Sequence, residues 1–138
     1  MSSRILLAAS IAALLAGCAT TRMSDAQSLA LYRDHAGAPV RTIRYFDPVS
    51  WEKVDDDHLL LTMRPREVYL LRIAGPCLDW AGASPAIGIS SQAGYVSAGF
   101  DRVSVPDVPG GCRIEEIRPV DIGAVREARD QMAASGST

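Results

Sequence analysis

Residues 58–73, HLLLTMRPREVYLLRI, contain the pattern that decides the fold. Two apolar runs of strand length, His58–Met63 and Val68–Ile73, are separated by Arg64-Pro65-Arg66-Glu67. Proline at the second position of this connection pre-sets the backbone φ angle of a tight turn, so the pattern predicts a β-hairpin. Val68–Ile73 is apolar on both faces, which is typical of a central strand covered on both sides.

Short runs with strand periodicity stand on both sides of this hairpin. We expect further strands at Arg41–Phe46, Ala86–Ile89, Tyr95–Val105 and Cys112–Ile117. Within Tyr95–Val105 the apolar side chains change parity near Gly99–Asp101. This change predicts a bulge or a sharp bend, of the kind that turns a strand around a barrel or sandwich corner.

Helices are expected before and after the strands. Ser24 and Gln27 have the spacing of a capping box, and Gly37 ends the helix that they begin. Asp121 caps a second helix, which continues through Arg129. The sequence therefore predicts an α+β fold. Its sheet is mainly antiparallel, has about six strands and is curled like a barrel or sandwich, with helices at the N- and C-terminal ends.

The N-terminus has the features of an export signal. Arg4 precedes Ile5–Ala16, an apolar or small run without charge. This run is shorter than the roughly 20 residues that a helix needs to cross a membrane, so a secretory signal is predicted rather than a transmembrane helix. The end of the run, Leu15-Ala16-Gly17-Cys18, resembles the lipobox of bacterial lipoproteins. The alternative is an ordinary signal peptide that contains a cysteine.

The lipobox resemblance implies a cellular location and a division of the chain into segments. Cys18 would be lipidated and cleaved at its N-terminal side, and acyl chains would hold it to a membrane. Ala19 and Thr20 follow, without aspartate, which implies the outer membrane with the domain facing the periplasm. We therefore expect a signal peptide at residues 1–17, an acylated cysteine and tether at 18–23, a single domain at 24–134 and a disordered tail at 135–138.

Cys77 and Cys112 remain once Cys18 is lipidated. In an oxidising compartment a disulfide between them is the default expectation. The alternatives are a metal pair or a reactive thiol, and no histidine or third cysteine stands at ligand spacing to support either.

Charge excludes one class of partner. Of the 138 residues, 14 are basic and 16 are acidic, and loss of Arg4 with the signal leaves 13 against 16. No basic cluster appears. The pairs Arg64/Arg66 and Arg126/Arg129 are interpreted as turn and helix-surface charges. We expect no nucleic-acid binding.

Neither histidine has a partner pattern that predicts catalysis. Nucleophilic catalysis needs a nucleophile, a base and an orienting acid. His35 stands at the end of the first helix, and His58 begins a strand. Residues 88–92 lack the second glycine of a nucleophile elbow. No catalytic residue is therefore predicted.

The acidic run Asp55-Asp56-Asp57 with His58 could hold a divalent cation. The alternating acids, glycine and closing glutamate of a calcium loop are absent, which favours a solvated turn. No metal site and no cofactor are predicted. Trp51 and Trp80 could form a platform for a sugar or peptide, and core or rim packing is the alternative. Asp101 and Arg102 are interpreted as an ion pair that fixes the bend, with a pocket lining as the alternative.

Several motifs together resemble a known family. They are Tyr32, His35-Ala36-Gly37, Pro39-Val40, Arg44-Tyr45-Phe46, Trp51, Tyr69-Leu70-Leu71, Cys77, Phe100-Asp101-Arg102-Val103, Cys112 and Ile117-Arg118-Pro119-Val120-Asp121. The chain from Leu31 to Asp121 is similar to an uncharacterised family of small lipoproteins of Gram-negative bacteria, classed as a domain of unknown function. The resemblance implies a lipoprotein with a paired-cysteine β-rich domain and implies no activity.

Three functions remain open from the sequence. The first hypothesis is a non-enzymatic envelope lipoprotein that binds a partner protein or has an accessory role, which requires an exposed apolar or aromatic patch. The second is a periplasmic binder of a small ligand, which requires a concave pocket with convergent polar groups. The third, a hydrolase, requires His35 or His58 close to both an acid and a nucleophile.

The first prediction concerns Cys18. Cys18→Ser should leave an unprocessed or mislocated precursor, because the lipidated thiol directs the cleavage. Mass spectrometry of the mature protein should find an acylated N-terminus at Cys18. An unmodified mature N-terminus at any other residue would contradict the assignment.

Overall fold

The computed structural model describes residues 22–48, 50–75, 77–81, 86–106 and 109–136, with side chains omitted at 80 and 81. The predicted signal peptide, Cys18 and most of the tether lie outside the described residues. Among the described residues, no helix is long and apolar enough to span a membrane.

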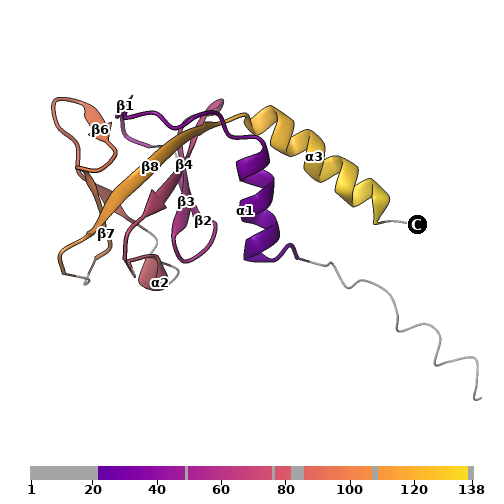
Figure 1. The fold of residues 1–138 in the computed structure, drawn as a ribbon, viewed down its shortest axis with the longest axis horizontal. Helices are drawn as coiled ribbons and strands as arrows, with labels where there is room; N and C mark the ends of the chain where they lie inside the picture. The colour runs from indigo at the N-terminus through magenta and orange to yellow at the C-terminus, as the bar shows by residue number, and fades with distance from the viewer. Residues whose placement is uncertain (1–21, 49, 76, 82–85, 107–108, 137–138) are drawn as a thin grey trace, which may run out of the picture.

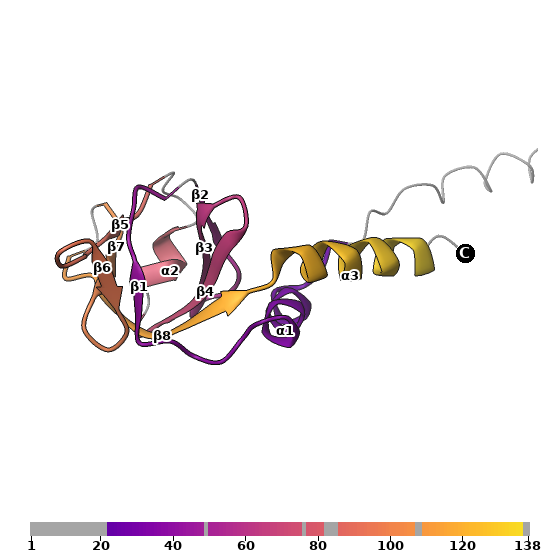
Figure 2. The ribbon, with the colours of Figure 1, turned by 90° about the horizontal axis from the view of Figure 1, so that it is seen from above.

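A six-stranded antiparallel sheet in the order β2-β3-β4-β8-β7-β5 forms the body of the molecule and curls into a half-barrel (Figures 1 and 2). A two-stranded ladder of β1 and β6 adds to it. The predicted α+β class is confirmed. The strands are β1 (Thr42–Arg44), β2 (Ser50–Lys53), β3 (His58–Arg64), β4 (Glu67–Ile73), β5 (Gly88–Ile89), β6 (Tyr95–Ser97), β7 (Arg102–Ser104) and β8 (Cys112–Val120).

The predicted hairpin is β3 and β4, and both of its strands are buried on two faces. Leu59 lies opposite Leu71 and Leu61 opposite Tyr69. These residues belong to the larger core inside the half-barrel, whereas Leu60 belongs to a second core on the outer face. Because successive side chains of a strand point to opposite faces, the continuous leucine run fills both cores at once.

Two helices cover the outer core. Helix α1 (Asp25–Asp34) begins with the predicted capping box between Ser24 and Gln27. Helix α3 (Ile122–Ser135) lies beside α1 and projects away from the half-barrel (Figures 1 and 2). Their buried residues Leu31, Tyr32 and Val125 pack on the outer face of β3, β4 and β8. A third, short helix, α2, spans Cys77–Ala81.

Strand β8 continues three residues beyond its predicted end at Ile117, through Pro119 to Val120. Proline usually interrupts a ladder because it lacks an N–H. Here the carbonyls of Ile117 and Pro119 accept hydrogen bonds from Val40 and Gly37 at 2.8 Å each. In an antiparallel strand, the N–H and the C=O of one residue face the same edge of the strand. Pro119 therefore faces the segment that contains Gly37 and Val40, and its missing N–H removes no hydrogen bond to β4.

Three other predictions need correction. Tyr95–Val105 is two strands, β6 and β7, that meet at a bend at Gly99, whose φ is +80°. The bulge or bend predicted near Gly99–Asp101 is present, because Ile114 bonds to both Gly99 and Asp101. Strand β2 was not expected, since its four residues between a proline and the acidic turn carry little strand signal. Helix α3 runs to Ser135, past Arg129, because no helix breaker precedes Gly136.

Cys77 and Cys112 are joined, with their Cα atoms 5.9 Å apart. This separation lies in the range that a disulfide requires, so the geometry supports the predicted pairing. The bond ties the start of α2 to the start of β8, and both sulfur-bearing residues are buried in the inner core.

The second prediction is that this bond contributes to stability. By the chain-entropy estimate, closing a loop with a sequence separation of 35 stabilises a fold by about 3–4 kcal/mol. Cys77→Ala should therefore lower the melting temperature by roughly 10 °C. Reductant should lower the melting temperature of the wild type and leave that of Cys77→Ala unchanged. Equal effects of reductant on both proteins would argue against the pairing.

Candidate functional site

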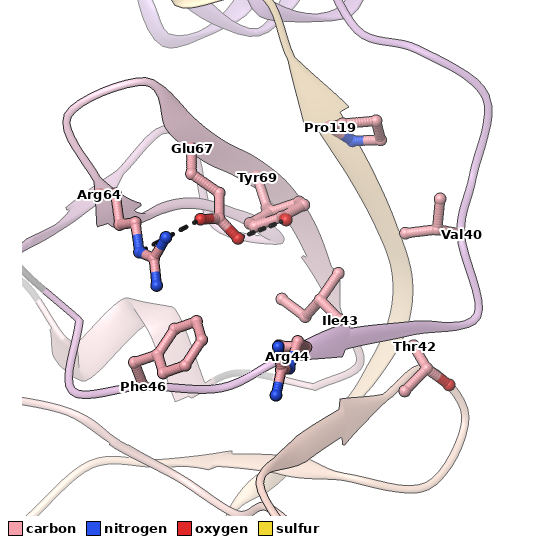
Figure 3. A pocket seen from close by; sticks show the side chains of 9 residues that line it. All are labelled: Val40, Thr42, Ile43, Arg44, Phe46, Arg64, Glu67, Tyr69 and Pro119. Carbon is pink, nitrogen blue, oxygen red and sulfur yellow. Dashed lines mark hydrogen bonds and ion pairs between the residues drawn. The ribbon is translucent and has the colours of Figure 1, made fainter.

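A pocket of about 460 Å³ opens between β1 and the turn of the β3–β4 hairpin (Figure 3). We call it the mouth pocket. Its volume is in the range of small-molecule and peptide side-chain sites. It is lined by Val40, Thr42, Ile43, Arg44, Phe46, Arg64, Glu67, Tyr69 and Pro119.

The floor of the mouth pocket is apolar. Ile43 belongs to the inner core, and Val40 and Tyr69 pack against that core. Tyr69 lies opposite Pro119 across the β4–β8 ladder, so the two side chains share the inner face of the sheet. The floor is thus the uncovered end of the half-barrel interior.

The rim of the mouth pocket combines an aromatic ring with two guanidinium groups. The Arg64 guanidinium carbon lies 4.7 Å from the centre of the Phe46 ring, and that of Arg44 lies 5.8 Å from it. Both distances are within the range of cation–π attraction. Phe46 nevertheless remains 37% exposed. The rim therefore exposes to solvent an aromatic ring with a positively charged guanidinium group on either strand beside it.

Glu67 and Tyr69 form the remaining polar part of the rim. The Tyr69 hydroxyl donates to Glu67 Oε1 at 2.9 Å, while Arg64 Nε is 3.8 Å from Glu67 Oε2. Burial, together with the neighbouring Glu67 carboxylate, raises the pKa of Tyr69 to about 12. Tyr69 is therefore a neutral hydrogen-bond donor at physiological pH.

One edge of β1 faces the mouth pocket without a strand partner. The N–H of Tyr45 bonds to Gly94, and the carbonyl of Arg41 accepts from Ala98, so odd-numbered residues face β6. Because antiparallel residues alternate between the two edges, the peptide groups of Thr42 and Arg44 face the other way. Within the described part of the chain, β1 pairs only with β6.

His58 lies far from this pocket and is only 6% exposed. Its Nδ1 is 2.8 Å from Asp55 Oδ1, and its Nε2 is 3.2 Å from Arg33 Nη2. A guanidinium group only donates, so Nε2 accepts and Nδ1 carries the proton that is donated to Asp55. The imidazole links α1 to the β2–β3 turn, and among the described residues its hydrogen-bond partners are Asp55 and Arg33, with no serine hydroxyl.

His35 and Trp51, two other candidate residues with described side chains, make structural contacts. His35 is the C-cap of α1, and its carbonyl accepts from the Asp121 N–H at 2.9 Å. Trp51 packs against the inner core. The side chain of Trp80 lies outside the described residues.

Asp101 and Arg102 do not pair with each other, which corrects the predicted ion pair. The buried Asp101 carboxylate accepts from the Ser90 hydroxyl and the Ser97 N–H, both at 2.7 Å. Arg102 donates instead to the carbonyls of Gly110 and Gly111, at 3.4 and 3.3 Å. The bend between β6 and β7 is thus fixed by hydrogen bonds to Asp101.

The acidic run forms the β2–β3 turn. Asp55 accepts from the Asp57 N–H at 2.9 Å and from His58, and Asp56 pairs with Lys53 at 2.9 Å. Among the residues that the structure describes, no group of three His, Cys, Asp or Glu side chains could hold a metal ion.

The mouth pocket itself was not foreseen. Arg64 was interpreted as a turn charge, and Arg44 and Phe46 only as part of a family motif and a strand. Arg44 and Arg64 are brought together by β1 and the hairpin, which have no direct pairing. The one local signal was the spacing of Arg64 and Glu67, three residues apart across the turn.

The fold and the pocket define a small α+β half-barrel domain with a mixed apolar and cationic mouth. The model of a family of unknown function, DUF6491, matches residues 1–136, so the chain belongs to that family. No curated protein and no solved structure matches the chain.

The third prediction is the tautomer of His58. At neutral pH, nitrogen-resolved NMR should show a proton on Nδ1 and none on Nε2, because Arg33 can only donate. The double variant Arg33→Met, Asp55→Ala should remove this preference at His58, because both ring nitrogens then lose their partners, and should leave the spectrum of His35 unchanged. A proton on Nε2 in the wild type would contradict the geometry.

The fourth prediction concerns alkaline pH. A tyrosine whose folded pKa is raised stabilises the fold below the ordinary value of 10, and this contribution is lost as pH rises from about 10 to about 12. Tyr69→Phe should abolish the part of the stability loss between about pH 10 and about pH 12 that comes from ionisation of Tyr69. Glu67→Gln should lower the Tyr69 pKa, followed by ring-carbon NMR, whereas Arg66→Gln should not. An unchanged pKa in Glu67→Gln would show that the hydroxyl is not bonded to Glu67.

Proposed function

We propose that the protein is an envelope lipoprotein, held to the outer membrane through Cys18, whose periplasmic domain is a non-enzymatic protein-binding module. The mouth pocket is its binding site. The observation that carries this proposal is the exposed Phe46 ring beside the Arg44 and Arg64 guanidinium groups. Aromatic residues and arginine are enriched at the energetic centres of protein interfaces.

The position of α1, the first helix after Cys18, supports the same function. Helix α1, which follows the tether, packs on the outer face of the sheet, in the core that contains Leu31 and Tyr32. The mouth pocket opens on the inner face, where Ile43 and Tyr69 lie. A membrane anchor at Cys18 therefore leaves the pocket free to meet a partner.

A small ligand is the second candidate, because the pocket volume of about 460 Å³ suits one. The exposed aromatic and cationic rim favours a protein. A hydrolase has less support: Asp55 and Arg33 engage the two ring nitrogens of His58, which would have to act as the base.

The fifth prediction tests binding at the mouth in cells. A photo-crosslinking phenylalanine analogue at position 46 should capture a defined envelope protein. The same analogue at position 100 is the matched control, since Phe100 is 63% exposed and lies outside the mouth pocket. Capture from position 46 and not from position 100 is expected. The same products from both positions, or none from position 46, would contradict the proposal.

A further inference from the structure

We infer that the mouth pocket binds an extended protein segment in which a carboxylate stands beside an apolar side chain, and that this segment adds to the free edge of β1. The inference rests on the proposed binding function and names the chemistry of the partner. Each of the three parts of such a segment meets a matching feature of the pocket.

The carboxylate meets the two arginines. Among the described residues, Arg44 makes no hydrogen bond or ion pair and contacts only the Phe46 ring. Arg64 is 65% exposed in its side chain and is held to Glu67 only at 3.8 Å. The rim thus holds two guanidinium groups and a single carboxylate, that of Glu67, and Tyr69 already donates to that carboxylate. The rim retains donors for a second anionic group, which arginine can bind through two parallel hydrogen bonds.

The apolar side chain meets the floor of the pocket. Val40, Ile43, Pro119 and the ring of Tyr69 offer apolar surface beneath the rim, as the close view shows (Figure 3). Burying one aliphatic or aromatic side chain there would remove its apolar surface from water. An acid without a neighbouring apolar group would leave this floor uncovered.

The backbone of the segment meets the edge of β1. The peptide groups of Thr42 and Arg44 face away from β6, and no other described strand pairs with them. An extended peptide that adds to such an edge gains main-chain hydrogen bonds, and its alternate side chains enter neighbouring pockets. Arg44 belongs to the same short strand. The backbone edge of β1 and the Arg44 guanidinium group can therefore bind the same peptide segment.

Two sources could supply the carboxylate: the C-terminus of a partner or an internal Asp or Glu side chain. Three mixtures of five-residue peptides separate them. The first has free C-termini and lacks Asp and Glu, the second is the same mixture amidated, and the third is amidated and contains Asp and Glu. The full chain, purified from membranes in detergent and immobilised, is exposed to each mixture, and mass spectrometry identifies the retained peptides.

The expected result is retention of the first or the third mixture at least about tenfold above the second, since charge-assisted hydrogen bonds are the stronger ones. Apolar residues should be enriched next to the acid. Arg44→Gln should reduce retention by about tenfold, whereas Arg66→Gln, in the hairpin turn but lining a different pocket beside Val120 and Arg126, should not.

Equal retention of the amidated mixture without acids, or retention of none, would overturn the inference. Complete displacement of the retained peptides by benzoate would also overturn it. Benzoate is a small aromatic acid without a peptide backbone, so such a result would mean that the edge of β1 contributes nothing to peptide binding. If crosslinking from position 46 still captures a protein in that case, the proposed function stands and only the chemistry of the segment is wrong.

Discussion

Strand β8 is paired along both of its edges, and the remaining structure depends on this double pairing. From Ile114 to Val120 it is bonded to β4. Its other edge meets β7 first and then the segment that contains Val40 and Gly37. The disulfide at Cys112 fixes its start. A strand so engaged sets the curl of the sheet, because each neighbour must follow its twist.

The mouth pocket is a consequence of this arrangement. The chain leaves β8 after Val40 and pairs with β6 through β1, while the hairpin of β3 and β4 continues past the point of divergence. Between β1 and the β3–β4 hairpin, side chains at the end of the inner core are left uncovered. Natural proteins usually cover or charge an open strand edge, and here Arg44 and Arg64 stand beside it. The same charges that discourage non-specific pairing would give the site the preference for an anionic partner that we propose.

Local signals in the sequence predicted the elements whose cause is local. The alternating and continuous apolar runs gave the hairpin, the Ser24–Gln27 spacing gave the start of α1, and the two remaining cysteines gave a bond. Strand β2 was missed because its four residues carry little strand signal, although its partner β3 follows directly in the sequence. The separation of β6 from β7 depends on β1, which is distant in the sequence. The last strand was predicted to end at Ile117. Its continuation through Pro119 depends on Gly37 and Val40, which lie beside β8 only in the tertiary fold. The mouth pocket was missed for the same reason: its two arginines meet only through the tertiary fold.

Amide hydrogen exchange tests the central claim, a half-barrel held by β8 with an open edge at β1, most directly. We predict that the amides of Leu70 and Arg118, which face each other in the β4–β8 ladder, exchange most slowly. The amide of Tyr45, bonded to Gly94 at 2.8 Å, should be protected, whereas those of Thr42 and Arg44 should exchange almost as in an unstructured peptide. Protection of Thr42 and Arg44 equal to that of Tyr45 would contradict the account, because the edge would then be covered.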